Sequence, residues 1–359
     1  MASENKKIML SGGGSGGPVT PLLEITKTLR LLKPELEFVF VGTETGPEKK
    51  MVADFGNLRF VTLPAGKFRR YFSLKNFSDI FLIGSAFFKS FSLLKKERPS
   101  IVISVGSFAS VPLIYAAALL KIPVLIHQQD IRPGLANRLM APCASVITAV
   151  FEKTLVDYGP KAVLTGNPIS LPDKEVVFDE TLNHLFKSDK PLVLILGGGT
   201  GAIAINDLVK NTKNELLKFC NLIHVSGKNK ADVNNVSADN YLAVEFLSHD
   251  KLMAIMAKSS LIISRCGLAT LTEISALQKP SILIPIPSSH QEDNAEAFAR
   301  AEAALVLHQK YLSPDVFISE IQRLVNNKEL LHKYGRNVYN LMEKGASEKI
   351  ANIILEIIK

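Results

Sequence analysis

Short runs of apolar residues alternate with amphipathic stretches along the first half of the chain. Runs such as Ile101-Val102-Ile103 are continuously apolar, as is typical of strands buried on both faces of a parallel sheet. The pattern predicts strands at residues 7–10, 37–41, 59–63, 101–105, 124–127, 146–149 and 162–165, with helices between most of them. The first half is therefore expected to form an α/β domain.

The alternation stops at residues 166–173, GNPISLPD, where one glycine and two prolines interrupt it, and then starts again. Further strands are predicted at residues 192–196, 222–225, 242–245, 261–264 and 281–285, followed by helices and an amphipathic segment at 348–358. A chain of 359 residues is long enough for two domains. We expect one Rossmann-like domain at 1–167 and another at 168–345, with the helix at about 346–359 packing back on the first.

A glycine-rich turn follows the first predicted strand of each half. The sequence SGGGSGG occupies residues 11–17, and GGGTGA occupies residues 197–202. Such turns bring backbone N–H groups and the positive end of a helix close to an anion. The candidate substrate contacts in them are Ser15, Gly16, Gly17, Gly198, Gly199, Thr200, Gly201 and Ala202.

The same turns also match the dinucleotide-binding pattern, G-x-G-x-x-G in the first and its G-x-G-x-x-A variant in the second. A dehydrogenase needs one such site and a distinct catalytic domain. Here both halves resemble nucleotide-binding domains, which favours a glycosyltransferase with two Rossmann-like domains whose sheets face a cleft.

The net charge of +8 favours polyanionic or anionic lipid partners. Residues 66–96 combine basic and aromatic side chains, with Phe and Leu at helical spacing from 74 to 94. One interpretation is a core helix with solvated lysines, and the other is a patch that docks on an anionic membrane. The candidate membrane contacts are Lys67, Arg69, Arg70, Phe77 and Phe81. Nucleic acid is not expected as a partner, because Phe81-Leu82-Ile83 is too apolar for a polar strand.

The three cysteines are widely spaced and form no metal-ligand pattern, which favours a reducing, cytoplasmic setting. The sequence shows no apolar signal core at its start and no uncharged apolar run of about 18 residues. We therefore expect neither a membrane span nor a metal or cofactor.

Residues 264–273 read as a strand end, a glycine turn and a helix start. Glu273 is suited to accept hydrogen bonds from a ribose diol, although it also fits a plain helix N-terminal charge. Gln291 and Asn294 are three residues apart on one predicted helical face, where their amides suit sugar hydroxyls.

Together these motifs resemble the MurG family of N-acetylglucosaminyltransferases over residues 6–345. The motifs that carry the resemblance, in the family's order, are GGGSGGPVTPLL, VGSFASVP, HQQDIRPGLANR, TGNP, GGGTGA, SRCGLATLTE and HQEDNA. The resemblance implies a GT-B-type fold, no essential metal, a donor diphosphate at the second glycine turn and a membrane-docking first domain.

The resemblance also assigns individual residues. It places the donor ribose on Glu273, its N-acetylglucosamine on Gln291 and Asn294, and its uracil beside Phe246 and Leu247. Further candidate substrate contacts within the shared motifs are Asn137, Arg265 and Gly267.

The acceptor half departs from the family at three places. Pro18 stands where the family has a histidine, His127-Gln128-Gln129-Asp130 replaces H-E-Q-N, and Ser170 replaces an arginine. The candidates for the catalytic base are His127 and Asp130, although His127 fits equally well as a buried core histidine at the end of its strand.

The sequence thus predicts inverting transfer of N-acetylglucosamine from UDP-N-acetylglucosamine to lipid I, at the cytoplasmic side of the membrane. Two alternatives stay open. One is a related UDP-sugar:lipid transferase with a different acceptor, and the other is a nucleotide-binding oxidoreductase.

Overall fold

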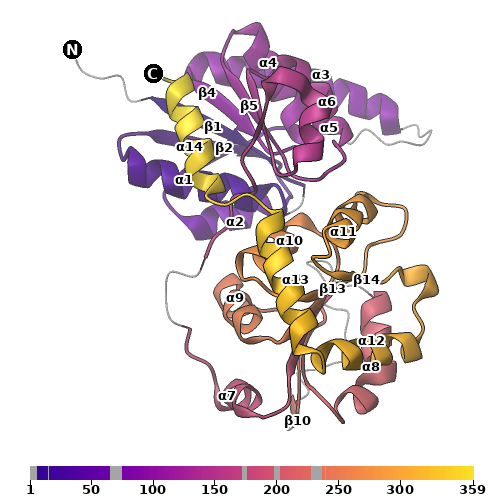
Figure 1. Cartoon of the computed structure of the whole chain (residues 1–359). Helices are drawn as coiled ribbons and strands as arrows, with labels where there is room; N and C mark the ends of the chain where they lie inside the picture. The colour runs from indigo at the N-terminus through magenta and orange to yellow at the C-terminus, as the bar shows by residue number, and fades with distance from the viewer. Residues whose placement is uncertain are drawn as a thin grey trace. The chain divides into compact units, whose positions relative to one another are not determined.

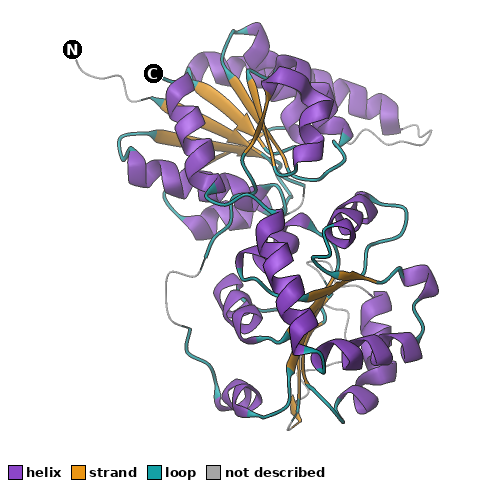
Figure 2. Ribbon diagram, viewed as in Figure 1, coloured by secondary structure: helices purple, strands orange, loops and turns teal. Residues whose placement is uncertain are grey.

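The computed structural model of the chain contains two compact units. It describes residues 6–14, 16–64, 75–171, 176–197, 203–227, 237–238 and 240–359, with only the backbone described at 75–81 and 237–238. The first unit comprises Met1–Ile169 and Glu343–Lys359, and the second comprises Ser170–Met342. In each unit the strands lie between layers of helices (Figures 1 and 2).

The first unit is built on a seven-stranded parallel sheet with the order β3-β2-β1-β4-β5-β6-β7. Its strands are β1 (Lys7–Ser11), β2 (Glu37–Gly42), β3 (Arg59–Thr62), β4 (Ile101–Ser104), β5 (Val124–Gln128), β6 (Val146–Ala149) and β7 (Ala162–Leu164). All seven strands predicted for this half are confirmed, with ends that differ by one residue at most.

Helices cover both faces of this sheet. They are α1 (Val19–Leu32), α2 (Glu48–Phe55), α3 (Lys75–Glu97), α4 (Val111–Leu119), α5 (Leu135–Met140), α6 (Leu155–Tyr158) and α14 (Ala346–Ile357). Ile8 and Leu10 join a core with α1, α2 and α14, whereas Met9 joins a core with α3, α4 and α5. The last helix of the chain, α14, thus packs beside α1 in the first unit (Figure 1).

The helix predicted across the aromatic segment is confirmed as α3, which packs along α4. Some side chains of α3 fit the core-helix interpretation, and others are exposed, so docking on a membrane stays a prediction. Phe87, Phe91 and Leu94 pack against the core, whereas Leu82 is 41% exposed and Phe88 is 72% exposed. Within the described residues, no helix combines the length and the apolar character needed to span a membrane.

The second unit has a sheet of the order β10-β11-β9-β8-β12-β13-β14, parallel except for the β10–β11 pair. Its strands are β8 (Leu192–Leu196), β9 (Asn221–Val225), β10 (Ser237–Ala238), β11 (Tyr241–Val244), β12 (Leu261–Ser264), β13 (Ser281–Leu283) and β14 (Leu305–Val306). The strands β10 and β14 were not predicted, because each has only two residues, too few to show the period of a strand.

The helices of the second unit are α7 (Glu180–Lys187), α8 (Ile203–Leu216), α9 (His249–Lys258), α10 (Leu268–Ala276), α11 (His290–Arg300), α12 (Pro314–Val325) and α13 (Lys328–Leu341). One core joins α8 and α12 to the sheet through Ile205, Val209 and Phe317.

In the sheet of the first unit, two neighbouring strands are followed by helices on opposite faces. The strand β1 leads to α1 on one face, and its neighbour β4 leads to α4 on the other. The loops diverge at the carboxyl ends of such strands, which is where open α/β sheets bind ligands. The motifs singled out in the sequence lie at these carboxyl ends.

Candidate active site

The first glycine turn, after β1, surrounds a buried carboxylate. Glu48 is the first residue of α2 and is fully buried. Its Oε2 accepts a hydrogen bond from Gly14 N–H at 3.2 Å, and its Oε1 accepts from Thr43 N–H at 2.8 Å and Thr43 Oγ1 at 2.5 Å. In this turn an internal anion therefore occupies the N–H group of Gly14, a residue next to the predicted substrate contacts at 15–17 and not one of them.

Glycine is needed where the chain passes this carboxylate. A Cβ added to Gly13, Gly42 or Gly46 would meet Glu48 side-chain atoms at 2.4, 2.8 and 2.0 Å. Burial by itself raises the pKa of Glu48, but the hydrogen bonds from Thr43 and from backbone N–H groups outweigh it and lower the pKa. Glu48 is thus held as a carboxylate at the positive end of α2.

The next predicted site residue, His127, lies at the carboxyl end of β5 and is fully buried. Its Nε2 lies 3.1 Å from Asn167 Oδ1, and its Nδ1 lies 2.9 Å from Thr148 Oγ1. Asn167 Oδ1 also accepts from Gln129 Nε2 at 3.2 Å, which assigns the hydrogen of the imidazole to Nε2.

Burial lowers the pKa of His127 to about 4, so its ring is neutral at pH 7. Both of its nitrogens are occupied by neighbouring side chains. This environment fits the core-histidine interpretation of His127, and a catalytic role for it stays a prediction.

Gln128 stands where the family has a glutamate, and it connects three segments. Its Oε1 accepts from Asn137 Nδ2 at 2.6 Å and from the Tyr158 hydroxyl at 3.0 Å, while its Nε2 donates to the Asp130 carbonyl at 2.6 Å. A neutral amide supplies both the acceptor and the donor that these contacts require, which a carboxylate cannot do.

Asn137 presents an unsatisfied oxygen at the same edge of the sheet. The residue is 5% exposed, and among the described residues its Oδ1 has no hydrogen-bond partner. A Cβ at Gly106, in the loop after β4, would meet this Oδ1 at 2.8 Å. A buried acceptor without a partner is costly, which fits the prediction that Asn137 contacts substrate.

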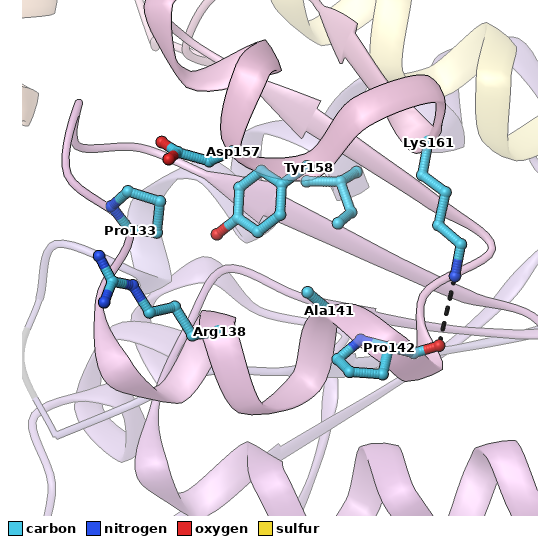
Figure 3. A pocket seen from close by; sticks show the side chains of 8 residues that line it. Pro133, Arg138, Ala141, Pro142, Asp157, Tyr158 and Lys161 are labelled. Atoms are coloured by element: carbon cyan, nitrogen blue, oxygen red, sulfur yellow. Dashed lines mark hydrogen bonds between the residues drawn. The ribbon is translucent and has the colours of Figure 1, made fainter.

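Asp130 is the last residue of the motif at 127–130 and is half-buried, so it is accessible where His127 is not. The first unit also contains a cavity of about 460 Å³ whose lining includes Arg138, Asp157, Tyr158 and Lys161 (Figure 3). Burial raises the pKa of the Tyr158 hydroxyl, which keeps it a hydrogen-bond donor to Gln128. The motif and this cavity are therefore connected through the Gln128–Tyr158 contact.

In the second unit, three predicted residues support the turn between β12 and α10. Gln291 Oε1 accepts from Cys266 N–H at 3.2 Å, and Asn294 Nδ2 donates to the Cys266 carbonyl at 3.2 Å. Arg265 donates to the carbonyls of Ile284 and Pro285 at 3.0 and 3.2 Å.

Asn294 and Gln291 differ in how much of the side chain remains available to bind a sugar. Asn294 is fully buried on the backbone of Cys266. Gln291 is half-buried, and its Oε1 accepts from the N–H groups of both Cys266 and Ile286. Its Nε2 takes no part in these two bonds. Gly267 precedes α10 with open space at its Cα. Sugar binding by these residues stays a prediction, and Gln291 is better placed for it than Asn294.

Glu273 lies on α10 and is 9% exposed. Its Oε1 is 3.7 Å from Nδ1 of His249, the first residue of α9. Burial raises the pKa of the Glu273 carboxyl to about 7, and the imidazole of His249 acts in the opposite direction. Phe246, three residues before His249, is 68% exposed, and Leu247 is half-buried.

Of the predicted contacts in the first glycine turn, Gly16 and Gly17 are described, and the Gly16 carbonyl accepts from Val19 N–H at 3.1 Å. The predicted contacts outside the described part are Ser15, Gly198, Gly199, Thr200, Gly201, Ala202, Lys67, Arg69 and Arg70, together with the side chains of Phe77 and Phe81.

Sequence reasoning missed four residues that the structure brings into these sites: Glu48, Thr148, Asn167 and His249. Asn167 was visible only as part of TGNP, where Gly and Pro suggested a linker. The glycines at 42 and 46 were a signal for Glu48, because both lie shortly before the start of α2, where the chain passes the Glu48 side chain closely.

Comparison with known proteins identifies both halves of the chain. Residues 8–148 match the glycosyltransferase family 28 N-terminal domain, and residues 192–352 match the family 28 C-terminal domain. A UDP-N-acetylglucosamine--N-acetylmuramyl-(pentapeptide) pyrophosphoryl-undecaprenol N-acetylglucosamine transferase of Clostridium kluyveri is 36% identical, over 97% of this chain and 99% of that protein. The protein of the same name from Lachnospira eligens is also 36% identical, over 97% and 98%.

Solved structures agree on the fold. MurG of Acinetobacter baumannii is 24% identical, with a TM-score of 0.76 over 98% of this chain and 99% of that one. MnaA of S. aureus, solved with UDP, is 17% identical, with a TM-score of 0.73 over 98% and 97%. The predicted fold of two Rossmann-like α/β domains is confirmed.

Proposed function

Because the chain belongs to the family of UDP-N-acetylglucosamine--N-acetylmuramyl-(pentapeptide) pyrophosphoryl-undecaprenol N-acetylglucosamine transferases, we propose that it transfers N-acetylglucosamine from UDP-N-acetylglucosamine to lipid I, giving lipid II. The observation that carries this proposal is identity of 36% across 97% of the chain, which includes both family 28 domains. A nucleotide-binding oxidoreductase is correspondingly disfavoured.

In the proposed reaction, the acceptor hydroxyl attacks C1 of the donor sugar while UDP leaves from the opposite face, which inverts the configuration at C1. The leaving diphosphate gains negative charge. Residues 198–202, for which the sequence predicts a glycine turn, and the positive end of α8 would stabilise that charge without a metal. Glu273 would accept hydrogen bonds from the ribose, and Gln291 would select the N-acetylglucosamine.

The contacts in the first unit favour Asp130 over His127 as the general base that takes the proton of the acceptor hydroxyl. A general base needs hydrogen-bond access to the hydroxyl that it deprotonates. Asp130 is half-buried, whereas His127 is fully buried between Thr148 and Asn167. Asn137 Oδ1 would orient the acceptor beside Asp130.

We also propose that the first unit docks on the cytoplasmic face of an anionic membrane, where a lipid-linked acceptor resides. The packed helices α3 and α4 expose Leu82, Phe88 and Leu119, and Lys89 beside Phe88 is exposed too. Apolar side chains next to cations suit the interface of an anionic bilayer.

The test is a transfer assay with labelled UDP-N-acetylglucosamine and purified lipid I, followed by mass analysis of the product. A disaccharide-linked lipid with inverted linkage supports the proposal. Transfer to another lipid acceptor alone would favour the related transferase, which the departures at Pro18 and Gln128 keep open. Binding of NADH without binding of UDP would overturn the proposal.

A further inference from the structure

His249 joins three segments of the second unit through its imidazole ring. It begins α9, its Nδ1 lies 3.7 Å from Glu273 Oε1 on α10, and its Nε2 lies 3.2 Å from the Ser170 carbonyl oxygen at the start of the unit. Within the described residues, this imidazole is the charged or titratable group that faces the Glu273 carboxyl.

These contacts determine where the hydrogens of the pair must lie. A carbonyl oxygen only accepts, so Nε2 of His249 carries a hydrogen. In a neutral ring Nδ1 then has no hydrogen, and its lone pair faces Oε1 of Glu273, which repels it if the carboxyl group is ionised. The arrangement is therefore attractive only when the pair holds one further proton, either on Nδ1 or on the carboxyl group.

A ribose diol discriminates between these two states. The two hydroxyls of the diol can each donate to one oxygen of a carboxylate. A protonated carboxyl group has lost one of these acceptor sites. Binding of the diol therefore favours the state in which the proton resides on Nδ1 and Glu273 is ionised.

We propose that His249 is a positioning residue for donor binding, whose imidazolium keeps the buried Glu273 carboxylate ionised to accept hydrogen bonds from the ribose of a uridine nucleotide. This inference rests on the proposed function, in which Glu273 contacts the donor ribose. The burial of Glu273 supports it, because a carboxylate that is 9% exposed is costly to ionise without a cation beside it. Since the pKa of Glu273 is already about 7 with the imidazole present, the effect falls near neutral pH.

The test compares UDP binding by calorimetry from pH 6.5 to pH 9 in the full chain and in His249→Gln. Loss of the imidazolium raises the pKa of Glu273 further. The expected result is a loss of UDP affinity of about tenfold at pH 6.5, which should shrink by pH 9. The matched control is His332→Gln, an exposed histidine on α13 of the same unit, which should bind like the unmodified chain.

Two further measurements separate this role from a merely structural one. The analogue 2′,3′-dideoxy-UDP lacks the diol, so the unmodified chain and His249→Gln should bind it equally well. His249→Arg keeps a cation at every pH and should retain most of the UDP affinity at pH 6.5.

The outcomes distinguish the inference from the proposed function. Parallel pH profiles of UDP binding for His249→Gln and the unmodified chain would overturn the inference alone. An equal loss for UDP and its dideoxy analogue would overturn it too, by showing a general defect. Failure of the unmodified chain to bind UDP at any pH would overturn the proposed function as well.

Discussion

Replacement of Glu48 by glutamine should destabilise the first unit by removing one charge-assisted hydrogen bond and leaving the Gly14 N–H group without its acceptor. The carboxylate accepts from Gly14 N–H through one oxygen and from Thr43 through the other. A glutamine can keep the oxygen that faces Thr43, but its NH2 group then opposes Gly14 N–H. One hydrogen bond to a charged group, with its partner left unpaired, corresponds to about 1–3 kcal/mol of unfolding free energy.

The assay is urea unfolding of Glu48→Gln together with hydrogen exchange at the Gly14 amide. The matched control is Glu44→Gln, an exposed glutamate four positions earlier, which should change neither quantity. Because the two units need not unfold together, the amide exchange assigns the effect to the first unit. Exchange at Gly14 should become faster in Glu48→Gln and stay unchanged in the control.

The pH dependence gives a second check with a defined sign. The pKa of Glu48 is lowered in the folded protein, so its stabilising contribution is present above its unfolded pKa of about 4.3 and is lost as pH falls through the folded value. The difference between the unmodified chain and Glu48→Gln should therefore shrink below about pH 4. Equal stability and equal Gly14 exchange for the Glu48 and Glu44 variants at pH 7 would refute this reasoning.

Three further outcomes are expected. Glu273→Ala should raise the UDP dissociation constant at least tenfold in a titration, about 1.4 kcal/mol, and unchanged UDP binding would contradict the ribose assignment. Gln291→Ala should reduce discrimination between UDP-sugars more than it reduces UDP affinity. In transfer assays Pro18→His should change turnover by less than about tenfold, whereas Asp130→Asn should lower turnover by about 10²-fold or more. A larger effect of Pro18→His than of Asp130→Asn would exclude Asp130 as the base. Phe88→Ser should weaken sedimentation with anionic vesicles even at high salt, because salt screens charge attraction and not apolar insertion; undiminished sedimentation would remove Phe88 from the docking surface.

The long strands and helices were predictable from the sequence because their apolar residues are consecutive or regularly spaced. The strands β10 and β14 were not, since two residues carry no period. For the sites, the limit is contact between segments that lie far apart in the sequence. Glu273 and Gln291 could be selected from a local motif, whereas the partners of His127 lie on β6 and beyond β7, and only the assembled sheet brings them together.

His249 and Glu48 show a further limit of sequence reasoning. Each is ordinary in its own segment and acquires its role from a residue on another element, Glu273 in one case and Gly14 in the other. Burial then changes the proton affinity of the carboxyl group, and sequence alone does not report burial.

The position of α14 affects the order in which the chain can fold during synthesis. Ile350, Ala351 and Ile354 of this helix are buried against the core that includes Ile25 and Leu29 of α1. The ribosome makes the whole second unit before it makes α14, so the apolar face of α1 stays uncovered until the last residues emerge. The second unit can thus fold before the first is complete, and a chain that stops before Ala346 would expose the kind of surface that chaperones bind.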